Sequence, residues 1–314
     1  MKKKAIIISI KGTSLSNKEK FLLSKKNPWG LILFKRNIKS FHQVKSLTNN
    51  IRKLTKDKNF PILIDEEGST VSRLIDIYNH NIDAKLFGDL YKINQKIALA
   101  LYKNYLISLC KNLKKIGINI NTIPVLDVTR KNTNKIIGKR SFSENKEIVK
   151  KLGEITIRKL HSQKVATVIK HIPGHGCSSV DSHLSMPKVN LSEKMLNKID
   201  FHPFRFSRSK LAMTAHILYS KIDSKNVSTF SNKIIKNIIR KKIKFKGILM
   251  SDDISMKALK YDLVTNAIKS ITAGCNLVLY CAGNIKDNFK LIKAVPFIDK
   301  FTIKKTSEIY KILR

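Results

Sequence analysis

The sequence predicts an α/β protein folded as a single (β/α)8 barrel, with residues 1–314 forming one domain. Eight short apolar runs alternate along the chain with amphipathic stretches, which is the order of parallel strands joined by helices. Polar and charged residues directly follow several of these runs, as they do at the carboxyl ends of barrel strands. A length of 314 residues is also within the range that such barrels reach as one domain.

The predicted strands are short and rich in β-branched residues, which is typical of strands covered on both faces. They lie at residues 5–10, 30–34, 61–64, 118–120, 165–169, 211–214, 247–250 and 276–280. Because helix-like stretches separate them along the whole chain, a closed barrel of the TIM type is favoured over an open doubly wound sheet.

The stretches between the strands have the spacing of amphipathic helices. The clearest spans 93–116, where apolar residues recur every three or four positions and predict the apolar face of a helix; they are Ile97, Leu101, Tyr105, Leu109, Leu113 and Ile116. Gly117 follows and is expected to end this helix. Further helices are predicted at 41–54, 146–161, 231–242 and 264–273.

The chain carries 62 Lys and Arg against 22 Asp and Glu, a formal net charge of +40. Such a charge by itself indicates nucleic acid or an anionic surface as a partner. The lysines are scattered, however, and isoleucine, asparagine and lysine are abundant together, as AT-rich codons would produce. No zinc-finger spacing, RNA-binding signature or low-complexity arm accompanies the charge. Two interpretations stay open, compositional bias on solvated faces and a surface that attracts anions.

The sequence predicts a protein of a reducing, cytoplasmic compartment. No apolar run approaches the roughly 20 residues of a transmembrane helix, and the run at 5–10 is shorter than the usual signal-peptide core. The four cysteines are Cys110, Cys177, Cys275 and Cys281, and no two form a C-x-x-C pair. Neither a zinc site nor a disulfide framework is indicated, and Cys110 is expected in the core.

The densest group of chemically active residues lies at 170–183, where three histidines, an aspartate and two glycines follow a predicted strand. Asp181 and His183 flank one residue, so in an extended loop their side chains lie on the same side. A carboxylate beside an imidazole orients the ring and raises its basicity, which suits proton transfer at neutral pH. Histidines that only cap a loop, or a metal site, are the alternatives, and no second cluster supplies obvious metal ligands.

Two adjacent carboxylates, Asp252 and Asp253, end another apolar strand. Since side chains alternate along a strand, only one of them is expected to point into the mouth of the barrel. The other is expected to cap a helix that begins near Ser255.

Two further segments add charged residues. Asp65 follows the strand at 61–64, and Arg73 comes after the turn beyond it, a pair suited to binding hydroxyls or to a structural ion pair. Arg140 lies in a tight loop at 137–142, which on its own is weak evidence for a site.

Taken together, these segments resemble glycoside hydrolase family 3, in particular its bacterial NagZ-type β-N-acetylglucosaminidases (β-hexosaminidases). The likeness extends over almost the whole chain. Its most specific part is 170–183, which matches the pattern KH-x-PGHG…DSH. The other matching segments, in the expected order, are 29–38, 117–121, 124–128, 215–216 and 251–256.

The resemblance implies a retaining hydrolase that works through a covalent glycosyl-enzyme. Asp252 would be the nucleophile, and His183, oriented by Asp181, would act first as general acid and then as general base. This differs from the two carboxylates that most retaining glycosidases use. The remaining implied residues, which would hold the hydroxyls and the acetamido group of a terminal N-acetylglucosamine, are Asp65, Arg73, Arg140, Lys170 and His171.

The implied activity is that of a cytoplasmic exo-β-N-acetylglucosaminidase that releases terminal non-reducing N-acetylglucosamine from peptidoglycan fragments during cell-wall recycling. Its partner would be a carbohydrate substrate, a muropeptide, with no cofactor or metal, no membrane, no specific nucleic acid and a monomeric enzyme. A phosphorylase on the same site is an alternative, because a histidine repels an attacking phosphate less than a carboxylate does. The alternative from another functional class is a basic nucleic-acid-binding protein whose barrel has lost catalytic activity.

The chain departs from the family pattern at a few positions. Where the family commonly reads EGGR-V-x-R, Ser69 and Thr70 replace the second glycine and the first arginine, while Arg73 keeps the second arginine. Asn276 replaces a frequent aspartate, and Ser143 to Asn145 depart from a frequent Gly and Asp-Pro step. These changes are expected to affect loop geometry and specificity rather than the basic reaction.

Overall fold

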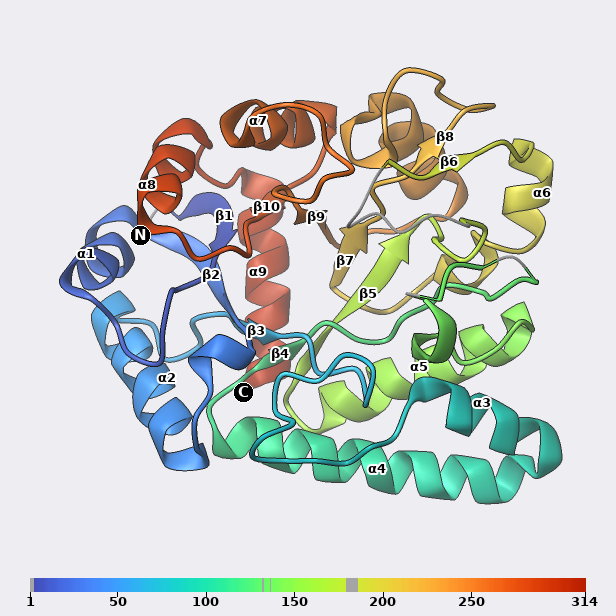
Figure 1. Ribbon diagram of the computed structural model, residues 1–314, viewed down its shortest axis with the longest axis horizontal. Helices are drawn as coiled ribbons and strands as arrows, with labels where there is room; N and C mark the ends of the chain where they lie inside the picture. Colours follow the sequence, from blue (N-terminus) through green and yellow to red (C-terminus); the bar gives the residue numbers. More distant parts are fainter. Residues whose placement is uncertain (1–2, 132, 136, 179–185) are drawn as a thin grey trace.

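The computed structural model describes residues 3–131, 133–135, 137–178 and 186–314. Its eight parallel strands close a barrel in which each strand pairs with the next barrel strand along the chain, with helices around it (Figure 1). The strands are β1 (Lys4–Ile8), β2 (Pro28–Leu33), β3 (Ile62–Ile64), β4 (Ile120–Asn121), β5 (Ala166–Ile172), β7 (Leu211–Thr214), β9 (Ile248–Asp253) and β10 (Leu277–Leu279). The predicted (β/α)8 barrel is confirmed, and each predicted strand overlaps an observed one.

The α-helices are α1 (Asn17–Phe21), α2 (Phe41–Thr55), α3 (Ala84–Ile93), α4 (Gln95–Lys115), α5 (Lys146–Ser162), α6 (Glu193–Lys198), α7 (Leu263–Ala273), α8 (Ile285–Ala294) and α9 (Lys300–Leu313). The helix predicted at 231–242 is observed as a π-helix at Ile234–Lys242. A small parallel sheet of β6 (Lys188–Val189) and β8 (Leu218–Tyr219) lies outside the barrel and was not predicted. Among the described residues, no helix is both long and apolar enough to span a bilayer.

The buried face of α4 differs in part from the predicted one. Ile97 and Leu101 are exposed, with 54% and 49% of their surface accessible, whereas Leu109 and Leu113 are buried as predicted. The first half of the helix instead buries Ala98, Tyr102 and Leu106. Helices α3 and α5 pack against this face, and the Tyr102 hydroxyl lies 2.6 Å from Oγ1 of Thr156 on α5. Apolar residues occur on both faces of α4, so tertiary contacts decided which one is buried.

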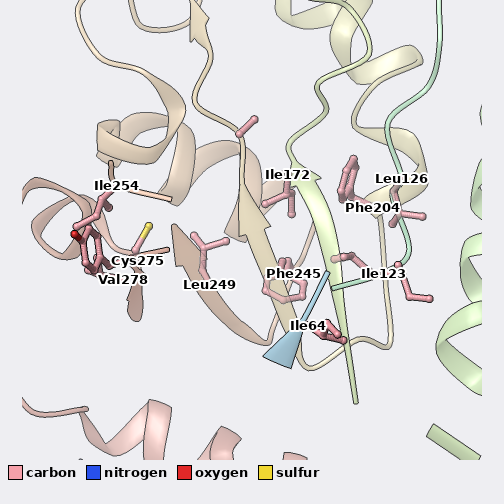
Figure 2. Close-up of a cluster of buried hydrophobic side chains, with 14 of the residues drawn as sticks. Ile64, Ile123, Leu126, Ile172, Phe204, Phe245, Leu249, Ile254, Cys275 and Val278 are labelled. Atoms are coloured by element: carbon pink, nitrogen blue, oxygen red, sulfur yellow. The ribbon is translucent and has the colours of Figure 1, made fainter. Parts of the chain in front are cut away.

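The strands separate two layers of apolar side chains. One layer fills the barrel and includes Ile7, Trp29, Leu63 and Met213. The other lies between the strands and the surrounding helices (Figure 2 shows part of it, with Ile172, Leu249 and Val278 labelled). Cys110 belongs to this outer layer, as predicted. Interior side chains are therefore packed as in other barrels of this kind, and the described residues leave no open pore through the middle.

Helix α9 lies across the end of the barrel where the strands begin (Figure 1). Ile309 on α9 is fully buried with the interior side chains, and Nε1 of Trp29 at the start of β2 donates to Oγ1 of Thr306 at 2.8 Å. Tyr310 accepts from Lys3, just before β1, at 2.7 Å. Because α9 closes this end of the barrel, a functional site is expected at the opposite end, where the strands finish.

Candidate active site

A cavity of about 240 Å³ lies at the carboxyl ends of the barrel strands. Its lining residues are Asp65, Glu67, Val71, Arg73, Ile137, Arg140, Lys170, His171, His175, Met213, Asp252, Leu279 and Cys281. All six predicted site residues that the structure describes are among them, namely Asp65, Arg73, Arg140, Lys170, His171 and Asp252. The other two, Asp181 and His183, lie outside the described residues.

A larger cavity, of about 610 Å³, lies between the loop before α1 and helix α2. Its lining includes Lys20, His42 and Lys53 but no carboxylate. It is far less suited to acid–base or nucleophilic chemistry than the cavity at the strand ends, which combines three carboxylates with three cationic side chains.

Asp65 directly follows β3 and accepts hydrogen bonds from both sides. Nη2 of Arg73 lies 3.2 Å from Oδ2, and Nζ of Lys170 lies 3.3 Å from Oδ1. The hydroxyl of Thr122 also donates to Oδ1. Burial alone would raise the pKa of Asp65, but the charges of Lys170 and Arg73 outweigh it and hold the pKa well below its ordinary value. Asp65 is therefore ionised at neutral pH and offers an acceptor in the cavity.

Glu67 links two of the predicted residues and was not itself predicted as part of the site. Nε and Nη2 of Arg140 donate to its two oxygens at 2.6 and 3.0 Å, and Nζ of Lys170 also contacts it. Burial opposes ionisation, but Arg140 and Lys170 outweigh it and lower the pKa of Glu67 to about 2. The sequence signal that could have identified Glu67 was its position two residues after Asp65, because side chains two residues apart in an extended segment lie on the same side.

Asp127 fixes the position of His171 and was also not predicted as a site residue. Its Oδ2 lies 2.7 Å from Nδ1 of His171, and its carboxylate accepts the backbone N–H of His171 at 3.2 Å and of His175 at 2.6 Å. The pKa of Asp127 stays below its ordinary value because interactions with His171 and His175 outweigh burial. An ionised Asp127 keeps the proton on Nδ1 of His171. The sequence signals for Asp127 were its place in the family-like segment 124–128 and its position directly after the apolar residues 124–126.

Asp252 is the penultimate residue of β9, and its side chain lines the cavity. Its Oδ1 accepts the backbone N–H of Asp253 at 2.8 Å. Burial alone would raise the pKa of Asp252, but His216, His171, the Asp253 N–H and Lys170 together lower it. A partly buried carboxylate that stays ionised beside a cavity of this size can act as a nucleophile.

Asp253 is turned away from the cavity, which confirms that only one member of the pair enters it. Its side chain accepts from the backbone N–H and the hydroxyl of Ser255 at 3.1 and 2.7 Å, and from the N–H of Cys281 at 3.2 Å. The prediction of a helix that begins near Ser255 is wrong. A turn follows β9, and α7 begins at Leu263, with Asp262 as its N-cap.

His216 supports the segment that carries Asp252. The ring is fully buried, with Nε2 at 3.0 Å from the carbonyl oxygen of Asp253 and Nδ1 at 2.7 Å from Oγ1 of Thr229. A carbonyl oxygen only accepts, so Nε2 carries the proton and Nδ1 accepts from Thr229. Burial lowers the pKa of His216, which keeps the ring neutral. The sequence places this histidine in the family-like segment 215–216, and the structure places it behind the site.

The departures from the family pattern have structural partners. The hydroxyls of Ser69 and Thr70 donate to the carboxylate of Asp83 at 2.7 and 3.0 Å, which ties the loop after β3 to the start of α3. Oδ1 of Asn276 accepts from the N–H of Leu249 and from Nη2 of Arg240, both at 2.9 Å. These three departures are therefore accommodated outside the cavity lining.

The described residues contain no group of three or more His, Cys, Asp or Glu side chains arranged to hold a metal ion. All four cysteines are free thiols. The chemistry visible in the cavity is thus that of ionised carboxylates, cationic hydrogen-bond donors and imidazoles.

Comparisons with known proteins point in one direction. Residues 3–306 match the glycosyl hydrolase family 3 N terminal domain. A beta-hexosaminidase of Actinobacillus succinogenes is 32% identical over 305 residues, which cover 94% of this chain and 87% of that protein. A beta-hexosaminidase of Haemophilus influenzae is 31% identical over 303 residues, covering 93% of this chain and 85% of that protein. The crystal structure of NagZ from Neisseria gonorrhoeae with N-trifluoroacetyl-D-glucosamine superposes with a TM-score of 0.89 at 30% identity, over 98% of this chain and 90% of that one.

Proposed function

The chain belongs to glycosyl hydrolase family 3, and we propose that it is a retaining exo-β-N-acetylglucosaminidase. It is a glycoside hydrolase of the β-N-acetylhexosaminidase type. We propose that residues 1–314 act as a single catalytic domain. The observation that carries the proposal is the Asp252 carboxylate, whose neighbours lower its pKa, in a cavity that Asp65, Lys170 and His171 also line.

The proposed binding mode places the terminal N-acetylglucosamine in the cavity. Asp65 accepts from sugar hydroxyls, while Lys170 and Arg140 donate to sugar oxygens. Hydrogen bonds that involve a charged partner are the strong ones, and fixed donors and acceptors orient the sugar ring for reaction. The Neisseria NagZ binds an N-acylated glucosamine, which supports the choice of sugar.

In the first proposed step, a carboxylate oxygen of Asp252 attacks the anomeric carbon and forms a covalent glycosyl-enzyme. The bond from that carbon to the glycosidic oxygen breaks, and protonated His183 gives its proton to the leaving oxygen. Asp181 orients the His183 ring and stabilises its charged form. Asp252 suits its role because its pKa is lowered, so that it is an unprotonated nucleophile at neutral pH.

In the second proposed step, neutral His183 takes a proton from a water molecule while the water oxygen attacks the anomeric carbon. The ester bond to Asp252 breaks, which regenerates the carboxylate and the protonated imidazole. Two inversions at the anomeric carbon give net retention, so the first product is the β-anomer of free N-acetylglucosamine.

The proposed biological role is the release of terminal N-acetylglucosamine from peptidoglycan fragments in the cytoplasm, by a monomer that acts on muropeptides during cell-wall recycling. Membership of a family whose similar members are beta-hexosaminidases supports the sugar-releasing part of this role. The remainder rests on the resemblance of the sequence to NagZ-type enzymes.

The test is hydrolysis of 4-nitrophenyl N-acetyl-β-D-glucosaminide by the wild type, Asp252→Asn and a control, Asp89→Asn. Asp89 lies on α3 in an exposed ion pair with Lys85. We expect Asp252→Asn to lose at least about 1000-fold in kcat, as removal of a nucleophile does elsewhere, and the control to keep its activity. Equal rates for the wild type and Asp252→Asn would refute the assignment.

Product analysis completes this test. Proton NMR of the reaction should show the β-anomer first, followed by mutarotation. In phosphate buffer, free sugar identifies a hydrolase, whereas sugar 1-phosphate as the main product would identify a phosphorylase.

A further inference from the structure

A buried carboxylate with no role in the proposed reaction, that of Glu66, lies where the barrel meets the loop after β3. Its backbone is paired with Asn121 on β4. Nδ2 of Asn121 donates to the Glu66 carbonyl oxygen at 2.8 Å, and the Glu66 N–H donates to Oδ1 of Asn121 at 3.1 Å. Glu66 is fully buried and does not line the cavity, although its neighbours Asp65 and Glu67 do. The two bonds to Asn121 fix Glu66 to the barrel.

The Glu66 side chain binds the part of the loop that carries Arg73. Its Oε2 accepts the backbone N–H groups of Arg73 and Leu74 at 2.8 and 3.0 Å, and its Oε1 accepts the hydroxyl of Ser72 at 2.7 Å. Hydrogen bonds to a carboxylate are stronger than those to a neutral acceptor. Three consecutive loop residues are therefore held by one side chain that is itself fixed to the barrel.

His80, later in the same loop, adds a further contact to this carboxylate. Its Nε2 lies 2.9 Å from Oε1 of Glu66, and its side chain is only 5% exposed. The imidazole ring also contacts the rings of Tyr78 and, on α4, Tyr105, with centroids 5.2 and 5.5 Å away. The other side-chain bonds of Glu66 are all accepted ones, which fits Nε2 as the donor here. His80 therefore ties Glu66 to the packing between the loop and α4.

The loop that Glu66 holds presents the guanidinium group of Arg73 to the cavity. Nη2 of Arg73 lies 3.2 Å from Oδ2 of Asp65, and Cζ lies 5.1 Å from the centre of the Phe34 ring. The Arg73 side chain is 29% exposed, so its own contacts enclose it only in part. Groups that bind a substrate are effective only where the surrounding hydrogen bonds keep them in place. The bonds from Glu66 to the Arg73 backbone supply such support.

We propose that Glu66 and His80 are positioning residues for Arg73 and keep its guanidinium group where it binds the terminal sugar. The inference rests on the proposed function, in which Arg73 is one of the residues that hold N-acetylglucosamine. It adds to that function two residues that do not line the cavity themselves.

A purely structural role for the same contacts would have a different signature. Structural contacts stabilise the fold whether or not Arg73 is present. A positioning effect on sugar binding must instead disappear when Arg73 is removed. Residues that act through a shared partner give non-additive effects, which a double-mutant cycle measures.

The experiment measures kcat and KM for 4-nitrophenyl N-acetyl-β-D-glucosaminide. We expect His80→Leu to raise KM about fivefold and to leave kcat within about twofold of the wild type, because sugar binding weakens equally in the ground state and the transition state. This is less than a whole hydrogen bond to a charged group contributes, since the donors from Ser72, Arg73 and Leu74 remain. His80→Gln should keep a KM near the wild-type value, because its amide can donate to the same oxygen.

The same change is then made in an Arg73→Gln background. There we expect His80→Leu to alter kcat/KM by less than about twofold, since the residue through which it acts is gone. The matched control is His161→Leu. His161 on α5 is also partly buried, with Nε2 3.1 Å from Oγ1 of Thr167, near the start of β5 and away from the cavity. It should leave kcat and KM unchanged in both backgrounds, and thermal unfolding shows which variants are folded.

A wild-type KM in a folded His80→Leu protein would overturn the positioning role. A fivefold loss that persists in the Arg73→Gln background would also overturn it, because the effect would then not depend on Arg73. Where His80→Leu does not fold, Glu66→Gln takes its place in the cycle, with the same expected and contradicting results. These outcomes leave the glycosidase assignment intact, whereas a wild type that does not cleave the substrate would refute the proposed function and the positioning role with it.

Discussion

The carboxylate of Asp127 holds His171 at two points, the ring Nδ1 at 2.7 Å and the backbone N–H at 3.2 Å. The two residues are 44 positions apart in the sequence, and Asp127 is fully buried. This contact fixes both the orientation of the ring and the nitrogen that carries its proton. It makes Asp127 a positioning residue for His171.

We predict that Asp127→Asn lowers kcat/KM by about 100-fold, because an amide can donate to Nδ1 and select the wrong tautomer of His171, as in other carboxylate–histidine pairs. Steady-state kinetics checks this, with thermal unfolding recorded in parallel. Wild-type kinetics in a folded Asp127→Asn protein would contradict the positioning role.

The buried Glu67 should make stability depend on acid pH. Its pKa falls from 4.5 to about 2 on folding, so its contribution is fully present above pH 4.5 and is lost as the pH falls through about 2. A carboxyl group whose pKa is lowered this far contributes at most about 3 kcal/mol to the free energy of unfolding. We predict that Glu67→Gln is less stable than the wild type at pH 7 and loses less of its unfolding free energy between pH 5 and 2. Urea unfolding between pH 2 and 7 measures the unfolding free energy of both proteins. The same dependence of that free energy on pH in the two proteins would contradict a contribution from Glu67.

His216 should influence the reaction without touching the sugar. His216→Leu leaves the Asp253 carbonyl and the Thr229 hydroxyl without a ring partner, at a cost of about 1–3 kcal/mol, and loosens the segment that carries Asp252. We predict a lower kcat with little change in KM, and a smaller loss for His216→Gln, whose amide still donates to that carbonyl. A loss confined to KM would place His216 in substrate binding instead.

His183 should matter most for leaving groups that need a proton. We predict that His183→Ala slows hydrolysis of a phenyl N-acetyl-β-D-glucosaminide far more than that of the 2,4-dinitrophenyl compound, whose phenolate leaves unassisted. Matching losses on both substrates would argue against His183 as the general acid.

The fold was predictable because its signals are local. Each barrel strand lies in a short, mostly apolar run of the sequence, and each predicted strand overlaps an observed one. The exposed face of α4 was not predictable, since Ile97 and Leu101 look as suitable for burial as the residues that α3 and α5 cover. β6 and β8 have two residues each, too few to leave a pattern.

The site was partly predictable for the same reason. Asp65, Lys170 and Asp252 stand directly at strand ends, and the family pattern marks them. Glu67 and Asp127 owe their importance to partners far along the chain, with Arg140 lying 73 residues from Glu67. Contacts at such separations are set by how the strands close into a barrel, which no short window of sequence contains.

The closure of one barrel end by α9, together with the packed interior, determines how substrate and product enter and leave the cavity. The part of the chain that the structure describes leaves no passage through the barrel, so a molecule that enters the cavity must leave through the same entrance. In the proposed two-step mechanism, the departing alcohol must leave through this entrance before water can reach the glycosyl-enzyme. A small alcohol added to the medium would enter through the same opening and compete with water for the anomeric carbon. We expect the β-glycoside of that alcohol to accumulate in proportion to the alcohol concentration.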